Sequence, residues 1–86
     1  MDREGITGRQ IAAARALLGL GQAELAASAS ISVPTLKRME ASEGSATGMP
    51  NNVRAVRLAL EAAGLEFIPE NGGGAGIRFR KRNLGG

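Results

Sequence analysis

The sequence predicts a mainly α protein of four short helices followed by a C-terminal β-hairpin. Three observations lead to this fold class. Alanine is abundant and aromatic residues make up only 2% of the 86 residues, a composition that favours helices over a sheet sandwich. Apolar residues recur at helical spacing up to about residue 64. Beyond that point the spacing changes to the alternation of a half-buried strand.

The first helix is expected to begin after Thr7 and to run to about Leu18. Thr7 is the expected N-cap, and Gln10, three residues later, completes a capping box. Gly19 is a natural terminator because it tolerates the left-handed conformation that ends many helices. The apolar face of this helix consists of Ile11, Ala14 and Leu18.

A second helix is expected from Gln22 to about Ala29, followed by a Ser-rich turn over residues 30–32. Its inward residues are Leu25 and Ala26, and the small side chain of Ala26 lets the next helix cross closely. Ile31 is expected to fill the apolar space between the second and third helices.

The third helix is expected over residues 32–41, with Ser32 as its cap. Pro34 falls within the first turn, where a missing N–H has little effect. One face is apolar and the other basic. Leu36 and Met39 point to the core, and Lys37 and Arg38 lie on the opposite side.

The fourth helix follows a loop of small polar residues over 42–50 and is expected to be capped by Asn51 or Asn52. Gly64 is its expected C-terminal cap. Its inward residues are Val53, Val56 and Leu60.

Residues 65–68 and 77–80 are expected to form the hairpin, with a Gly-rich turn between them. Because an isolated hairpin is marginally stable, its open edge favours pairing with a second copy of the chain. Alternatively, Phe67 and Phe79 fold back onto the first and fourth helices. We therefore divide the chain into a helical domain at 1–64, a hairpin at 65–82 that is expected to serve as the dimerisation element, and a tail at 83–86 that is expected to be disordered.

The net charge of +3 is concentrated at the C-terminus. Residues 1–76 carry seven basic and eight acidic side chains, whereas residues 77–86 carry four basic and no acidic ones, so −1 and +4 sum to +3. Such a segment favours polyanions such as nucleic acid, and a solvated tail that aids solubility explains it equally well. The four basic residues are Arg78, Arg80, Lys81 and Arg82.

The chain has neither Cys nor His, which excludes disulfides, thiolate metal sites and the usual general base at neutral pH. The Gly-rich stretch at 72–76 lacks the Lys-Ser/Thr of a phosphate-binding loop. We therefore expect no enzyme, no catalytic residue, no metal and no cofactor. No apolar run is long enough to span a membrane, and the N-terminus has no hydrophobic signal region, so the cytoplasm is the expected compartment.

The second and third helices contain the pattern Gln-x-x-Leu-Ala at 22–26 and Ile-Ser-x-x-Thr-Leu-x-x-Met-Glu at 31–40. This stretch resembles the helix-turn-helix of the phage-repressor-like (Xre/Cro) family. The family usually has Gly where this chain has Ser30, and often a fifth helix where this chain has a hairpin. The matching residues are Arg15, Leu18, Gly19, Leu20, Gln22, Glu24, Leu25, Ala26, Ile31, Ser32, Thr35, Leu36 and Glu40.

The resemblance implies that the third helix enters the DNA major groove. The expected base contacts are Ser32, Val33, Pro34, Lys37 and Arg38. The expected phosphate contacts are Gln22, Thr35, Asn51 and Asn52. It also implies a structural ion pair between Arg15 and Glu40. Plainer alternatives are that Arg38 is an exposed helix charge, that Gln22 only starts a helix, and that Asn51 and Asn52 only cap one.

The function that the resemblance implies is a sequence-specific double-stranded DNA-binding transcriptional regulator, a repressor that acts as a homodimer on a roughly palindromic operator. It would work in the cytoplasm, associated with the nucleoid. The alternative is a protein-interaction module, such as an antitoxin or anti-activator, that binds another regulatory protein. The absence of acidic residues between Ser32 and Arg38 favours DNA. RNA is disfavoured because exposed aromatic residues are scarce.

Overall fold

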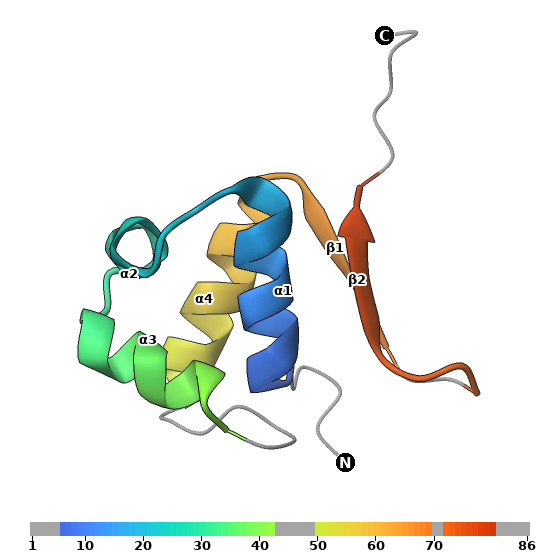
Figure 1. Cartoon of the computed structure of the whole chain (residues 1–86), viewed down its shortest axis with the longest axis horizontal. Helices are drawn as coiled ribbons and strands as arrows, with labels where there is room; N and C mark the ends of the chain where they lie inside the picture. Colours follow the sequence, from blue (N-terminus) through green and yellow to red (C-terminus); the bar gives the residue numbers. More distant parts are fainter. Residues whose placement is uncertain (1–5, 43–49, 70–71, 81–86) are drawn as a thin grey trace, which may run out of the picture.

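Within the residues that it describes, the computed structural model has four helices followed by a two-stranded antiparallel sheet, which confirms the predicted fold (Figure 1). It describes residues 6–42, 50–69 and 72–80. The expected tail at 83–86 and the basic Lys81 and Arg82 lie outside these ranges. The elements are α1 (Gly8–Leu18), α2 (Gln22–Ala29), α3 (Val33–Glu40), α4 (Pro50–Ala62), β1 (Leu65–Ile68) and β2 (Gly76–Phe79).

The start of α1 is set by the capping box that the sequence predicts. The Gln10 backbone N–H donates to the Thr7 hydroxyl oxygen at 3.0 Å, and the Thr7 N–H donates to the Gln10 amide oxygen at 2.8 Å. The Gln10 side chain also donates to the carbonyl oxygen of Gly76 at 2.8 Å. One residue therefore both caps α1 and ties the helix to the start of β2.

Both α1 and α2 end in the same left-handed turn. At the end of α1, the Leu20 N–H donates to the Arg15 carbonyl at 2.9 Å, and Gly19 has φ of 70°. At the end of α2, the Ile31 N–H donates to the Ala26 carbonyl at 2.9 Å, and Ser30 has φ of 58°. These are Schellman turns, which satisfy the last carbonyls of a helix. Ser30 therefore adopts the conformation that glycine would favour at that position.

The start of α4 corrects one expectation from the sequence. The helix begins at Pro50, so Asn51 and Asn52 lie inside its first turn and do not cap it. Proline suits this position because its fixed φ is helical and its missing N–H would have no helical partner. The residue that precedes Pro50 lies outside the described ranges.

The core lies where the four helices and β1 meet. Its largest fully buried side chains include Ile11, Leu36 and Leu60, one from each of three helices. Gly8 allows α1 to approach the end of α3 closely, because a Cβ at this position would lie 2.4 Å from the Met39 carbonyl oxygen. Among the described residues, the buried apolar ones are Ile6, Ile11, Ala14, Leu25, Ala26, Ala29, Leu36, Met39, Val56, Leu60 and Leu65.

The hairpin packs on α1 and α4, on the side away from α2 and α3 (Figure 1). In its register Leu65 pairs with Phe79 and Phe67 with Ile77, so these four side chains share the face that meets the helices. Phe67 packs against the core, as one reading of the sequence expected. Phe79 differs, because 55% of its surface remains exposed.

Among the described helices, none has the length and apolar character that crossing a membrane requires.

Candidate nucleic-acid interface

The turn between α2 and α3 fixes the point at which α3 begins. Ser30 reverses the chain in its left-handed conformation, and Ile31 packs against the core. Ser32 then caps α3, because its hydroxyl oxygen accepts from the Thr35 backbone N–H at 3.2 Å. Local sequence signals therefore set the residue at which α3 begins.

The side chains of Ser32 and Thr35 are bonded to each other at the first turn of α3. The Ser32 hydroxyl donates to the Thr35 hydroxyl oxygen at 2.8 Å. With its proton used in this way, Ser32 retains only acceptor capacity toward a ligand, whereas Thr35 still has its own O–H to donate. Ser32 therefore suits a base amino group, and Thr35 suits a phosphate oxygen.

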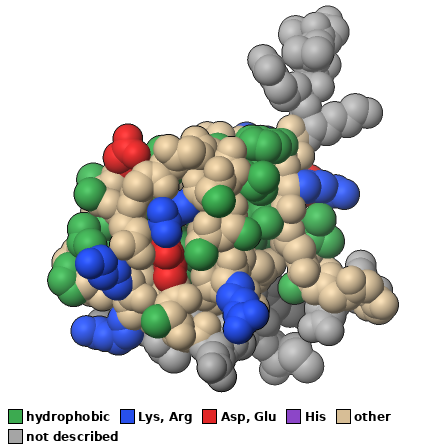
Figure 2. All heavy atoms as spheres, viewed as in Figure 1, with side chains coloured by type: hydrophobic (Ala, Val, Ile, Leu, Met, Phe, Trp, Pro, Cys, Tyr) green, Lys and Arg blue, Asp and Glu red, His purple; other side chains and the backbone are tan. Residues whose placement is uncertain are grey.

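The outer face of α3 combines basic and apolar side chains. Pro34, Lys37 and Arg38 are exposed, whereas Leu36 and Met39 are fully buried beneath them. Figure 2 shows basic side chains over α3 on the viewed face. This arrangement is the amphipathic pattern that the sequence predicts for the helix.

Val33 occupies an intermediate position at the start of α3. Its side chain is half-buried and packs against the core, so only part of its apolar surface faces outward.

Neither Lys37 nor Arg38 forms an ion pair with any residue of the described ranges. Their charges are therefore available to a ligand.

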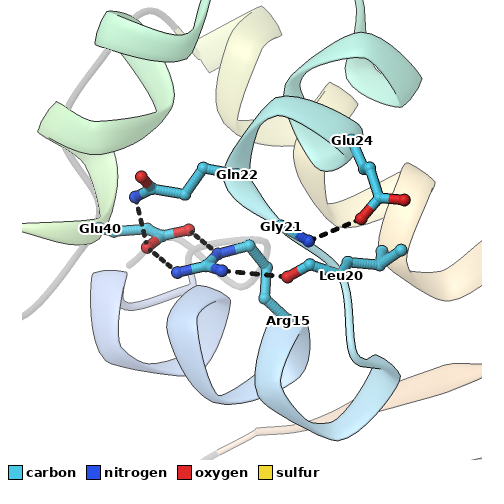
Figure 3. A network of polar contacts seen from close by, with 6 residues as sticks. All are labelled: Arg15, Leu20, Gly21, Gln22, Glu24 and Glu40. Carbon is cyan, nitrogen blue, oxygen red and sulfur yellow. Dashed lines mark hydrogen bonds and ion pairs between the residues drawn. The ribbon is translucent and has the colours of Figure 1, made fainter.

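The end of α3 is tied to α1 by the expected ion pair between Arg15 and Glu40 (Figure 3). The Arg15 Nε donates to Glu40 Oε2 at 2.7 Å and its Nη2 donates to Oε1 at 2.9 Å, a bidentate geometry. The Arg15 Nη1 donates to the Leu20 carbonyl at 3.0 Å. Hydrogen bonding to Glu40 raises the pKa of Arg15 above its ordinary value, although partial burial opposes this shift.

Gln22 at the start of α2 also reaches Glu40, which the sequence did not predict. Its Nε2 donates to Glu40 Oε1 at 3.1 Å, so α1, α2 and α3 all meet at one carboxylate (Figure 3). The second Nε2 proton of Gln22 has no partner in the described part of the chain. Gln22 is thus held in place with one donor still available for a phosphate.

Asn51 and Asn52 lie in the first turn of α4, where backbone N–H groups have no helical acceptor. Asn51 is exposed and Asn52 is half-buried. This end of the helix favours an anion through its free donors and the helix dipole.

The basic residues of the hairpin are not brought together with α3. Arg78 instead forms an exposed ion pair with Glu66, at 3.2 Å between Nε and Oε1. The hairpin and α3 lie on opposite sides of α1 and α4 (Figure 1). The outer face of α3, whose basic side chains are unpaired among the described residues, and the hairpin, whose Arg78 pairs with Glu66, are therefore two separate surfaces.

No family model matches the chain, and no curated protein matches it in sequence.

Proposed function

We propose that this chain is a sequence-specific double-stranded DNA-binding transcriptional repressor that acts as a homodimer and inserts α3 into the major groove. The observation that carries the proposal is the outer face of α3. Pro34, Lys37 and Arg38 are exposed there, with no acidic side chain between Ser32 and Arg38. A short helix with one buried face and one basic face has the shape and charge that a major groove accepts.

Arg38 is the strongest candidate for a base contact. It lies one turn after Pro34, and a guanidinium can donate two hydrogen bonds to O6 and N7 of guanine. Lys37 reaches either a base or a phosphate. Pro34 and the outward part of Val33 offer only apolar contact, which is suited to a thymine methyl group.

Phosphates on either side of the groove would be held by donors that flank α3. Thr35 and Gln22 each keep one donor available, and the first backbone N–H groups of α2 and α4 have no acceptor within their own helices. These contacts would set the register of the protein on the duplex and carry no sequence information. Asn51 and Asn52 would contribute at the start of α4.

A homodimer would read two half-sites about one helical turn apart, ~34 Å, on a roughly palindromic operator. Such a protein would work in the cytoplasm on the nucleoid and would repress transcription by blocking the polymerase.

The test is selection of bound duplexes from a randomised library, followed by titration of the enriched sequence. We expect one palindromic motif with wild-type protein and none with Lys37→Ala/Arg38→Ala. The matched control is Arg78→Ala/Arg80→Ala, which removes two positive charges from the opposite side of the protein and should keep the motif.

Two results would overturn the proposal. The first is the absence of any enriched motif, with only weak salt-sensitive binding to all sequences. The second is equal loss of binding in the two double variants, which would indicate general charge attraction. Either result would favour the protein-interaction alternative.

A further inference from the structure

Two large apolar side chains remain exposed on neighbouring elements. Leu17 of α1 is 44% exposed and Phe79 of β2 is 55% exposed. The helix and the strand pack against each other. Figure 2 shows hydrophobic side chains gathered between α1 and the hairpin on the viewed face.

The geometry of the two elements places Leu17 and Phe79 at the same height. The bond from Gln10 to the Gly76 carbonyl aligns these two residues, and from there α1 and β2 run in the same direction (Figure 1). Leu17 lies seven residues further along the helix, about 10 Å at 1.5 Å per residue. Phe79 lies three residues further along the strand, about 10 Å at 3.3 Å per residue. Leu17 and Phe79 therefore lie level with each other on neighbouring elements, and we treat them as one apolar patch.

At the edge of β2 beside this patch, some backbone groups have no partner among the described residues. The Arg80 N–H donates to the Gly64 carbonyl at 2.8 Å, which makes that pair a hydrogen-bonded one. Because such pairs alternate in an antiparallel ladder, the Leu65–Phe79 pair is not hydrogen-bonded. The N–H and C=O of Phe79 point away from β1, and no hydrogen bond to them occurs within the described residues.

We propose that a second copy of this chain covers the patch, with a two-fold axis that passes between Phe79 of one copy and Phe79 of the other. This register is self-complementary, because each Phe79 N–H donates to the other's carbonyl oxygen. It also gathers both Leu17 and both Phe79 side chains around the axis. The open edge is a template for an extended strand, and a second β2 provides one.

The proposed register avoids collision between the helices. Since α1 ends at Leu18, level with Phe79, the antiparallel partner places its own α1 beyond that end. If the two-fold axis passed nearer the start of β2, the two α1 helices would lie at the same height and collide. The interface also leaves α3 uncovered, because α3 lies on the opposite side of α1 (Figure 1).

The same register sets Arg78 of one copy opposite Arg80 of the other, on the face away from the helices. Like charges directly opposite each other weaken a strand pair. Glu66, which already pairs with Arg78, offsets part of this repulsion. This register therefore predicts repulsion between Arg78 of one copy and Arg80 of the other, and a substitution can turn that repulsion into attraction.

The inference rests on the homodimer of the proposed function and names its surface. The first experiment is sedimentation equilibrium without DNA, so that its failure and a failure of DNA recognition are distinguishable. We expect Leu17→Lys and Phe79→Lys each to raise the dimer dissociation constant roughly ten-fold or more, because a large apolar side chain is removed from the interface. Leu58→Lys is the matched control, since Leu58 is 51% exposed on α4, outside the patch.

The second experiment tests the register. Arg80→Glu places a carboxylate opposite Arg78 of the other copy and should lower the dissociation constant several-fold. Phe79→Cys should form a disulfide-linked dimer on oxidation, because hydrogen-bonded pairs hold their Cα atoms about 5.5 Å apart. The chain has no other Cys, and Leu58→Cys provides the control.

Three results would overturn the inference. A monomer at all concentrations would mean that Arg78 and Arg80 protect the edge from pairing. Equal weakening by Leu58→Lys would place the interface elsewhere. A weaker dimer with Arg80→Glu would contradict the register. Circular dichroism of each variant would establish that these exposed substitutions leave the fold intact.

Discussion

Arg15 and Glu40, 25 residues apart in the sequence, are joined by two hydrogen bonds of 2.7 and 2.9 Å. The pair connects the last turn of α1 to the last residue of α3. Glu40 is nearly buried, with 8% of its side chain exposed, and Arg15 is 22% exposed. The orientation of α3, and therefore of its basic face, is consequently fixed from its C-terminal end by one carboxylate.

Removal of Glu40 is expected to lower stability substantially. Glu40→Ala leaves the partly buried Arg15 guanidinium without its partner, and we expect a loss of about 2–3 kcal/mol in the free energy of unfolding. Urea denaturation followed by circular dichroism measures it. The control is Glu66→Ala, which breaks an exposed ion pair and should change stability by less than about 1 kcal/mol. Equal losses in the two variants would contradict a special role for Glu40.

Arg38 is expected to carry sequence discrimination. Arg38→Ala should weaken binding to the selected site by roughly 1–3 kcal/mol and relax the preference at one base pair. Competition with single-base variants of that site measures the effect. A uniform loss on all sequences would instead identify Arg38 as a phosphate contact. Thr35→Val is the comparison, since a lost phosphate donor should weaken binding to every sequence alike.

Ser30 is expected to be a site where glycine stabilises the protein. A left-handed conformation costs a non-glycine residue about 1–2 kcal/mol, and the greater freedom of glycine in the unfolded chain offsets part of the gain. Ser30→Gly should therefore raise the free energy of unfolding by about 0.5–1 kcal/mol. Gly19→Ala, at the equivalent position of α1, should lower it. Thermal melts of both variants measure these changes, and opposite signs are the required outcome.

The close approach of α1 to α3 predicts a strong effect at Gly8. A Cβ there would lie 2.4 Å from the Met39 carbonyl oxygen and 2.7 Å from that of Glu40, and backbone atoms cannot move aside easily. Gly8→Ala should destabilise the fold by about 2 kcal/mol or more. Gly21→Ala is the control, because its Cβ would have only an ordinary contact of 3.6 Å. A melting temperature unchanged by Gly8→Ala would contradict this packing.

The elements that the sequence predicted well are those set by neighbouring residues. Three local signals each determine a helix boundary to within one turn. They are the capping box of Thr7 and Gln10, the terminator Gly19, and the cap Ser32 followed by Pro34. The start of α4 was misplaced because two asparagines after a proline resemble caps, whereas the proline itself takes the first helical position.

The features that the sequence did not predict depend on distant residues. The Gln22 bond to Glu40 joins residues 18 apart, and the exposure of Phe79 depends on where α1 ends. Neither the Gln22–Glu40 bond nor the exposure of Phe79 can be predicted from the spacing of apolar residues in the sequence. The Arg15–Glu40 pair was expected only because of a family resemblance, since two charges of opposite sign occur at many positions in any chain.

Salt is expected to act in opposite directions on the two proposed interactions. DNA binding by α3 should weaken as salt rises, because phosphate contacts release bound counterions. Dimerisation should strengthen, because salt screens the repulsion between Arg78 and Arg80 of the two copies. Sedimentation without DNA and titration of the selected duplex, each at several salt concentrations, separate the two effects. In Arg80→Glu the dimer should lose strength with salt, since attraction then replaces repulsion. If the dissociation constant of the dimer had the same salt dependence in wild-type protein and in Arg80→Glu, this result would contradict the proximity of Arg78 of one copy to Arg80 of the other.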